Sequence, residues 1–164
     1  MKTTEMKIGT KHFGPKVDIT DPCYDRNVWC RINEVPIKEG TYDCLIWEAE
    51  EEILFRGKPV TNRTVAKIGI YLDGKIPDRS CFSYLGDIGV DAGLAGFFNE
   101  KPNYSPDEWK ELCDSIYPLG EGCEEAWIRD DGFFSSSGEG DGCYSVLCAK
   151  DAQGEIIALE IRFL

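Results

Sequence analysis

The stretch Gly142–Phe163, which reads GCYSVLCAKDAQGEIIALEIRF, decides the fold class. Gly142–Lys150 is rich in strand-forming residues, and Asp151–Gly154 has the composition of a turn. The chain then returns over Glu155–Phe163 with apolar residues at every second position. The stretch therefore predicts an antiparallel hairpin with one face in a hydrophobic core.

The two faces of the returning strand differ in character. One face carries Ile157, Leu159, Ile161 and Phe163. The opposite face carries the charged pair Glu160 and Arg162. This alternation is the period of a strand and not of a helix.

Upstream segments extend the β pattern. Thr64–Leu72 is rich in β-branched and aromatic residues, and it ends at Asp73-Gly74, a dipeptide typical of two-residue hairpin turns. Further strands are predicted over residues 13–19, 41–49, 52–56, 81–90 and 125–134.

One helix is well signalled after Ser105. This hydroxyl is an N-cap, Pro106 occupies the first helical position and Glu108 completes a capping box. Trp109, Leu112, Cys113 and Ile116 recur at helical spacing, and Tyr117-Pro118 with Gly120 would end the helix. A second short helix is predicted over residues 24–29, with Asp21 as its cap.

Together these elements predict a mainly β (α+β) protein. The expected architecture is an antiparallel β-sandwich or open barrel of about seven to nine strands, with one or two short helices packed on it. A chain of 164 residues is most simply one domain over 1–164, with residues 1–12 as a candidate mobile N-terminal segment.

The net charge of −12 narrows the possible partners. Residues 100–131 hold ten acids against three bases. This charge argues against nucleic acid or an anionic membrane surface as a partner, because phosphate contacts need clustered bases. The acids suit either a solvated face or the steering of a basic protein or a cation.

Other function classes lack their sequence signals. Met1–Ile8 has no apolar signal-peptide core, and no run approaches the roughly 18 apolar residues of a membrane span. We therefore expect a cytoplasmic protein with no membrane partner and with its eight cysteines reduced. His12 is the only histidine, which leaves little room for a catalytic triad, and zinc-finger or thioredoxin spacings are absent.

Three segments place a carboxylate beside glycine or proline at a strand end. They are Asp18–Tyr24, Gly89–Phe98 and the glycine-rich loop Phe133–Tyr144. Each has a structural explanation, because Asp side chains bond their own turns. If Asp21, Asp91 and Asp141 converge, their oxygens could instead hold Ca²⁺ or Mg²⁺.

The three segments together resemble the uncharacterised domain-of-unknown-function 4241 family. The shared motifs are Asp21-Pro22, Val90-Asp91-Ala92-Gly93 and a Ser-Gly-x-Gly-Asp-Gly-x-Tyr run that begins at Ser137. The resemblance covers roughly residues 14–164 and implies a bacterial or phage-type cytosolic protein of mostly β structure, without implying an activity. It points to these candidate ligand-binding positions: Asp21, Asp91, Gly93, Ser137, Gly138, Gly140, Asp141, Gly142 and Tyr144.

Three functions remain open. The first is a non-catalytic acidic binding protein that recognises a basic protein or a small polar ligand through strand-end loops, in the manner of an inhibitor or immunity protein, without a cofactor. Its motivation is the acidic 100–131 region beside Phe97, Phe98, Phe133 and Phe134.

The second function is a divalent-metal-dependent hydrolase of a phosphorylated or nucleotide-like substrate. Asp21, Asp91 and Asp141 would hold Mg²⁺ or Ca²⁺, and backbone amides of Gly138–Gly142 would face an anion. The third is a structural or assembly component. The sequence leaves the choice among them, and the oligomeric state, open.

Overall fold

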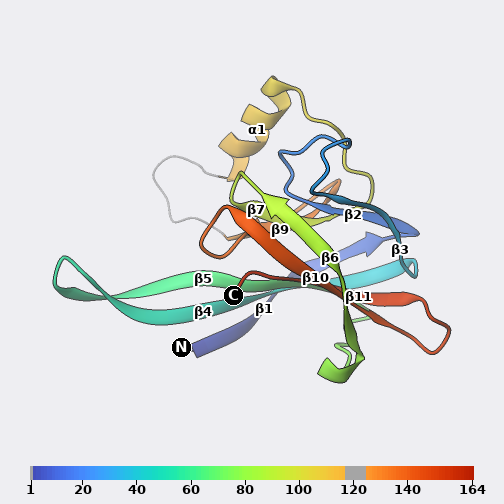
Figure 1. Ribbon diagram of the computed structural model, residues 1–164, viewed down its shortest axis with the longest axis horizontal. Helices are drawn as coiled ribbons and strands as arrows, with labels where there is room; N and C mark the ends of the chain where they lie inside the picture. Colours follow the sequence, from blue (N-terminus) through green and yellow to red (C-terminus); the bar gives the residue numbers. More distant parts are fainter. Residues whose placement is uncertain (1, 117–124) are drawn as a thin grey trace.

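The computed structural model describes residues 2–116 and 125–164, and it consists of two antiparallel sheets packed face to face beside one helix (Figure 1). The six-stranded sheet has the order β1 (Lys2–Phe13), β4 (Gly40–Phe55), β5 (Lys58–Leu72), β11 (Ile156–Arg162), β10 (Gly142–Lys150) and β6 (Phe82–Val90). The five-stranded sheet has the order β3 (Ile32–Pro36), β2 (Lys16–Thr20), β7 (Leu94–Phe98), β9 (Gly132–Ser136) and β8 (Ala126–Arg129).

The main core lies between the two sheets. Its fully buried side chains include Phe13, Ile68, Phe97, Phe133 and Ile161, which come from both sheets. This arrangement confirms the predicted mainly β sandwich with a short helix, although the described part of the chain holds eleven strands and not seven to nine.

The helix α1 (Pro106–Ile116) covers the outer face of the five-stranded sheet. Ile116 and the partly buried Trp109 and Leu112 pack on a second apolar cluster made of Leu94, Phe98, Trp127 and Phe134. The predicted capping box is confirmed, because Glu108 N donates to Ser105 Oγ and Ser105 N donates to Glu108 Oε1, both at 3.1 Å. The predicted end at Tyr117-Pro118 and Gly120 lies outside the described residues.

The predicted C-terminal hairpin is confirmed as β10 and β11, which pair from Ser145↔Arg162 to Lys150↔Ile156. The polar face of β11 is nevertheless buried at Glu160. Its carboxylate accepts a hydrogen bond from Tyr71 Oη at 2.6 Å and two from Arg79 at 2.9 Å, and Lys67 Nζ lies 3.3 Å away. Burial alone would raise the pKa of Glu160, but these partners lower it.

Several predicted boundaries are wrong. The 52–56 segment is the end of the continuous strand β4, and the turn of its hairpin is Arg56-Gly57, with positive φ at both residues. Asp73-Gly74 does form a turn, but β5 pairs with β4 and β11 and not with the strand that follows. The predicted strand over 125–134 is split by the turn at Asp130-Asp131 into β8 and β9.

The N-terminal third also differs from the prediction. Residues 2–13, where the sequence suggested a mobile segment over 1–12, form β1 and pair along β4 from Lys2↔Glu50 to Phe13↔Gly40. The predicted helix over 24–29 is absent. Two turns replace it, closed by Tyr24 N to Asp21 O at 3.2 Å and Val28 N to Asp25 O at 3.0 Å.

The hairpin of β4 and β5 extends beyond the rest of its sheet. The pairing of β1 with β4 reaches only as far as Lys2↔Glu50, and β11 pairs with β5 only over residues 67–71. Residues 51–62 therefore form a two-stranded projection, which we call the hairpin arm (Figure 1).

Candidate functional site

Asp21 joins the first predicted motif to the second. Its buried carboxylate accepts hydrogen bonds from Cys23 N at 2.9 Å, Asp91 N at 2.8 Å and Ala92 N at 2.6 Å. These bonds tie the end of β2 to the turn between β6 and β7. The carboxylate thus satisfies three backbone donors, which favours a structural role for Asp21.

The glycine-rich loop is joined to the same corner. Ser137 N donates to Gly93 O at 3.0 Å, and the buried Ser137 hydroxyl donates to Gly140 O at 2.8 Å. The Tyr144 hydroxyl reaches the same Gly140 carbonyl at 2.6 Å. Gly138 has φ of +60°, and a Cβ there would lie 2.9 Å from Cβ of Phe163, so this close turn requires glycine.

The structure therefore brings the three motifs together, but it gives their carboxylates different surroundings. Asp91 and Asp141 are exposed, whereas Asp21 is buried against backbone amides. Gly142 lies opposite Val90 in the β10–β6 pairing, and Gly140 N donates to Ser137 O at 2.9 Å. Within residues 2–116 and 125–164, no group of three or more His, Cys, Asp or Glu side chains is placed to hold a metal ion.

Cys23 lies in this corner without the properties of a nucleophile. Burial and then the nearby carboxylates of Asp21 and Asp91 raise the pKa of its thiol well above the usual range. A thiol that stays protonated is a poor nucleophile. The seven described cysteines are free.

Asp18 is a second buried acid in the first motif, at a position that the sequence did not mark as a candidate ligand. Its carboxylate accepts hydrogen bonds from Glu34 N at 2.9 Å and Lys101 N at 3.2 Å. Arg31 Nη2 and Arg26 Nη1 donate to it at 3.4 and 3.5 Å. Asp18 thereby ties the loops before β3 and after β7 to the five-stranded sheet.

The four phenylalanines that the sequence suggested as partner contacts are fully buried. Phe97 and Phe133 face the core between the sheets, and Phe98 and Phe134 face α1. The prediction that they contact a partner is wrong, because neighbouring residues on a strand point to opposite faces and both faces of this sheet are covered.

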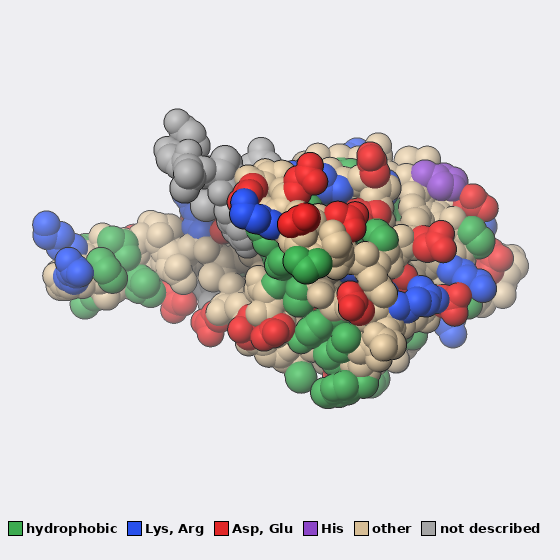
Figure 2. Space-filling view, turned by 90° about the horizontal axis from the view of Figure 1, so that it is seen from above, with side chains coloured by type: hydrophobic (Ala, Val, Ile, Leu, Met, Phe, Trp, Pro, Cys, Tyr) green, Lys and Arg blue, Asp and Glu red, His purple; other side chains and the backbone are tan. Residues whose placement is uncertain are grey.

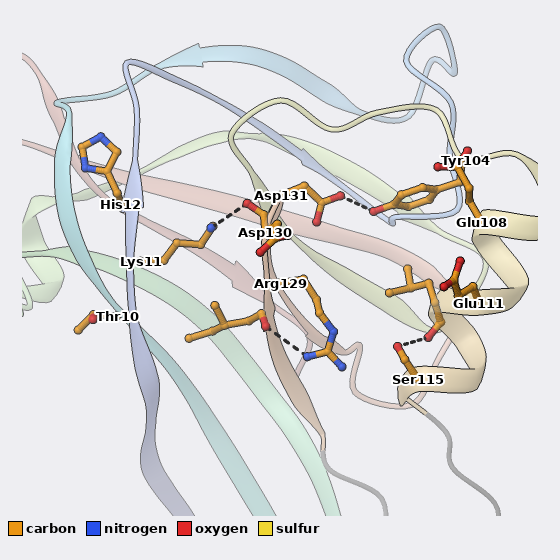
Figure 3. Close-up of a pocket in the computed structure, with 12 residues that line it drawn as sticks. Thr10, Lys11, His12, Tyr104, Glu108, Glu111, Ser115, Arg129, Asp130 and Asp131 are labelled. Atoms are coloured by element: carbon orange, nitrogen blue, oxygen red, sulfur yellow. Dashed lines mark hydrogen bonds between the residues drawn. The ribbon is translucent and has the colours of Figure 1, made fainter.

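A concave site lies elsewhere, between β1, α1 and the turn joining β8 to β9 (Figure 3). Its volume is about 860 Å³. We call it the acidic groove, and its lining residues are Thr10, Lys11, His12, Tyr104, Glu108, Glu111, Leu112, Ser115, Ile128, Arg129, Asp130 and Asp131.

The groove contains four carboxylates against two bases. Glu108 is used in the cap of α1, and Asp131 accepts a hydrogen bond from the Tyr104 hydroxyl. Among the described residues, neither a hydrogen bond nor an ion pair within 4.0 Å engages the carboxylates of Glu111 and Asp130. These two acids are thus available to a cation that enters the groove.

The two bases of the groove are engaged with backbone carbonyls. Lys11 Nζ donates to Asp130 O at 2.9 Å and joins β1 to the β8–β9 turn, while Arg129 Nη1 donates to Ile128 O at 3.2 Å (Figure 3). Neither forms an ion pair with a groove acid within the described ranges. The electrostatic character of the groove is therefore acidic.

Tyr104 is held rigidly at one end of the groove. Its ring stacks on the Trp109 ring, with ring centroids 6.3 Å apart. The side chain of Lys101 is buried, and its Nζ lies 4.3 Å from the centroid of the Tyr104 ring. Burial, together with the hydrogen bond to Asp131, raises the pKa of Tyr104. Burial and then Arg31 lower the pKa of Lys101 to about 8.

The described helix is too short to cross a bilayer. Comparisons with family models, with curated proteins and with solved structures gave no match for this chain. The resemblance to the domain-of-unknown-function 4241 family thus stays a prediction from the three motifs.

Proposed function

We propose that this chain is a non-catalytic cytoplasmic binding protein whose acidic groove accepts a lysine- or arginine-bearing segment of a basic protein. The observation that carries the proposal is the pair Glu111 and Asp130, two groove carboxylates without a hydrogen bond or ion pair among the described residues. An inhibitor- or immunity-like role against a basic toxin or nuclease is one concrete form of it.

The groove supplies both parts of such a contact. Leu112 and Ile128 offer partly buried apolar surface, and four acids line the same groove. The apolar stem of a lysine or arginine can lie on this apolar surface while its charged head contacts the acids. Part of the groove is a strand-end loop, because Asp130 and Asp131 form the β8–β9 turn.

The end of the groove at Tyr104 is preformed, which favours recognition of a ligand. Tyr104 is fixed by Trp109, Asp131 and Lys101, and the N-terminal end of α1 is fixed by its capping box. A preformed site loses little conformational entropy when a ligand enters, so it can bind at low cost in ordering.

A binding experiment with a defined probe tests the proposal. The probe is a fluorescently labelled oligoarginine peptide of about eight residues, measured by anisotropy at about 20 mM and about 200 mM salt. We expect binding that weakens at the higher salt. The double variant Glu111→Gln/Asp130→Asn should bind about 5- to 30-fold more weakly, as expected for the loss of two partly exposed ion pairs worth about 1–2 kcal/mol together.

The matched control is Asp107→Asn/Asp114→Asn, which removes the same charge from exposed positions of α1 outside the groove. This control should bind like the unaltered protein. Equal weakening in both double variants would show that only the overall negative charge attracts the peptide, and the proposal would then be wrong.

A further inference from the structure

The end of the hairpin arm is an exposed apolar tip with positive charge. Residues 53–60 read ILFRGKPV and contain two bases and no acid. Leu54 is 75% exposed and Phe55 59%, and Ile53 and Val60 are each 39% exposed. Four of the nine large hydrophobic side chains that are exposed in the described chain thus lie within these eight residues.

Such a cluster differs from scattered surface leucines. Contiguous exposed apolar side chains on a soluble surface mark interaction sites. Figure 2 shows apolar and basic side chains gathered at the end of the arm, far from the acidic side chains over the body. Behind the tip, Arg63 forms an ion pair with Glu50 at 3.0 Å, which partly balances the charges there. At the tip itself, Arg56 and Lys58 form no ion pair among the described residues.

The tip and the acidic groove are complementary. The tip offers Leu54 and Phe55 with the cations of Arg56 and Lys58, and the groove offers Leu112 and Ile128 with the carboxylates of Glu111 and Asp130. The apolar side chains of the tip match those of the groove, and bases without an ion pair match acids without one. The surface complementary to the tip is therefore a groove that combines acidic side chains with apolar ones.

The tip cannot reach the groove of its own molecule. Lys11 of the groove pairs with Tyr42 on β4, and Arg56 lies 14 residues further along the same continuous strand and turn. At about 3.3 Å per residue this places the tip roughly 45 Å from that point. The strand fixes this separation, so the groove that receives the tip has to belong to a second copy.

We infer that the hairpin-arm tip of one molecule docks in the acidic groove of a second copy, so that the protein associates head to tail. The inference rests on the proposed function, because the groove is the receiving site. A contact between two different surfaces of the same chain is heterologous, and it forms a ring if the rotation closes and an open chain if it does not.

Sedimentation velocity over a range of protein concentrations tests the inference, in about 150 mM salt to screen repulsion between the acidic bodies. We use a tip variant, Leu54→Ser/Phe55→Ser, and the groove variant Glu111→Gln/Asp130→Asn. Both sets of side chains lie at the surface or in the groove, so the core is untouched. Each variant alone should associate at least about 10-fold more weakly than the unaltered protein.

Mixing the two variants gives the decisive observation. The tip variant keeps its groove and the groove variant keeps its tip, so an equimolar mixture should form a one-to-one complex that neither variant forms alone. A control with Ile76→Ser/Tyr84→Ser removes exposed apolar surface elsewhere and should associate like the unaltered protein.

Three outcomes would overturn the inference. The unaltered protein could remain a monomer at all concentrations. The tip variant alone could lose association while the groove variant keeps it, which would indicate a tip-to-tip dimer. The tip could bind vesicles of anionic lipid without self-association, which would indicate a membrane surface. In each case the oligoarginine measurement still decides the proposed function independently, because that peptide needs the groove and not the tip.

Discussion

Single buried acids hold the loops of this protein in place. Asp21 and Asp18 each accept hydrogen bonds from backbone amides of two segments that are distant in the sequence. Glu160 does the same with side chains on the outer face of the six-stranded sheet. Acids of this kind stabilise the fold by accepting hydrogen bonds from buried donors. A buried amide or hydroxyl donor without an acceptor would destabilise the protein by its full desolvation free energy.

The Asp21→Asn variant tests this role. The amide keeps one acceptor oxygen but loses the charge and places an NH₂ group against backbone donors, so we expect the free energy of unfolding to fall by about 2–3 kcal/mol. Chemical denaturation measures this change. Asp91→Asn, at an exposed site of the same corner, should shift stability by less than about 0.5 kcal/mol. Equal effects of the two variants would contradict the structural role of Asp21.

At the scale of elements, some parts of the fold could be predicted and others could not. The β10–β11 hairpin and the capped start of α1 were predicted, because local periodicity and capping chemistry determine them. The segment after Pro22 has the composition of a capped helix, but Asp21 directs its carboxylate to Asp91 and Ala92 as well as to Cys23, and the chain forms turns instead. The hydrogen bond between Asp21 and Asp91 joins residues 70 positions apart, so it cannot be predicted from the local sequence pattern.

The groove was predictable only in part. The excess of acid over residues 100–131 marked the region, whereas the β1 wall at residues 10–12 carried no strand signal. Glu121 and Glu124, which belong to the predicted acidic region, lie outside the described residues. The adjacent phenylalanines misled the prediction because the five-stranded sheet is covered on both faces.

The contact between β4 and the residue before β8 gives a pH-dependent prediction. Burial, and then a hydrogen bond shared with Glu48, raise the pKa of Glu125 to about 7, and Glu125 Oε2 is buried without a hydrogen-bond partner among the described residues. Since the ordinary value is 4.5, the folded state binds a proton between pH 4.5 and 7 that the unfolded state does not. The free energy of unfolding should therefore fall as the pH rises through this window, by less than the roughly 1.4 kcal/mol for each pH unit that a fully buried proton would give, because water screens the partly exposed Glu125.

The Glu125→Gln variant isolates this contribution. It should flatten the pH dependence between about pH 5 and 7 and should be more stable than the unaltered protein at about pH 8, because it carries no charge into the contact with Glu48. Denaturant unfolding at four pH values measures both effects. An unchanged slope in the variant would mean that another group titrates in this range.

At the scale of the whole molecule, the two ends carry surfaces of opposite character. The net charge is −12, yet the arm ends in bases and apolar side chains, while four acids line the groove. This separation of unlike surfaces on one sandwich is the basis of both proposals. The three motif segments, by contrast, are occupied by hydrogen bonds that shape their own loops.

The central claim is that the acidic groove is where a cationic segment binds, and an NMR titration with the oligoarginine peptide tests it most directly. We predict that backbone amide shifts change at residues that line the groove, namely residues 10–12 and 128–131 together with Glu108, Glu111, Leu112 and Ser115. Shift changes confined to the acids Glu48, Glu50, Glu51 and Glu52 at the base of the arm, with the groove unaffected, would contradict the account.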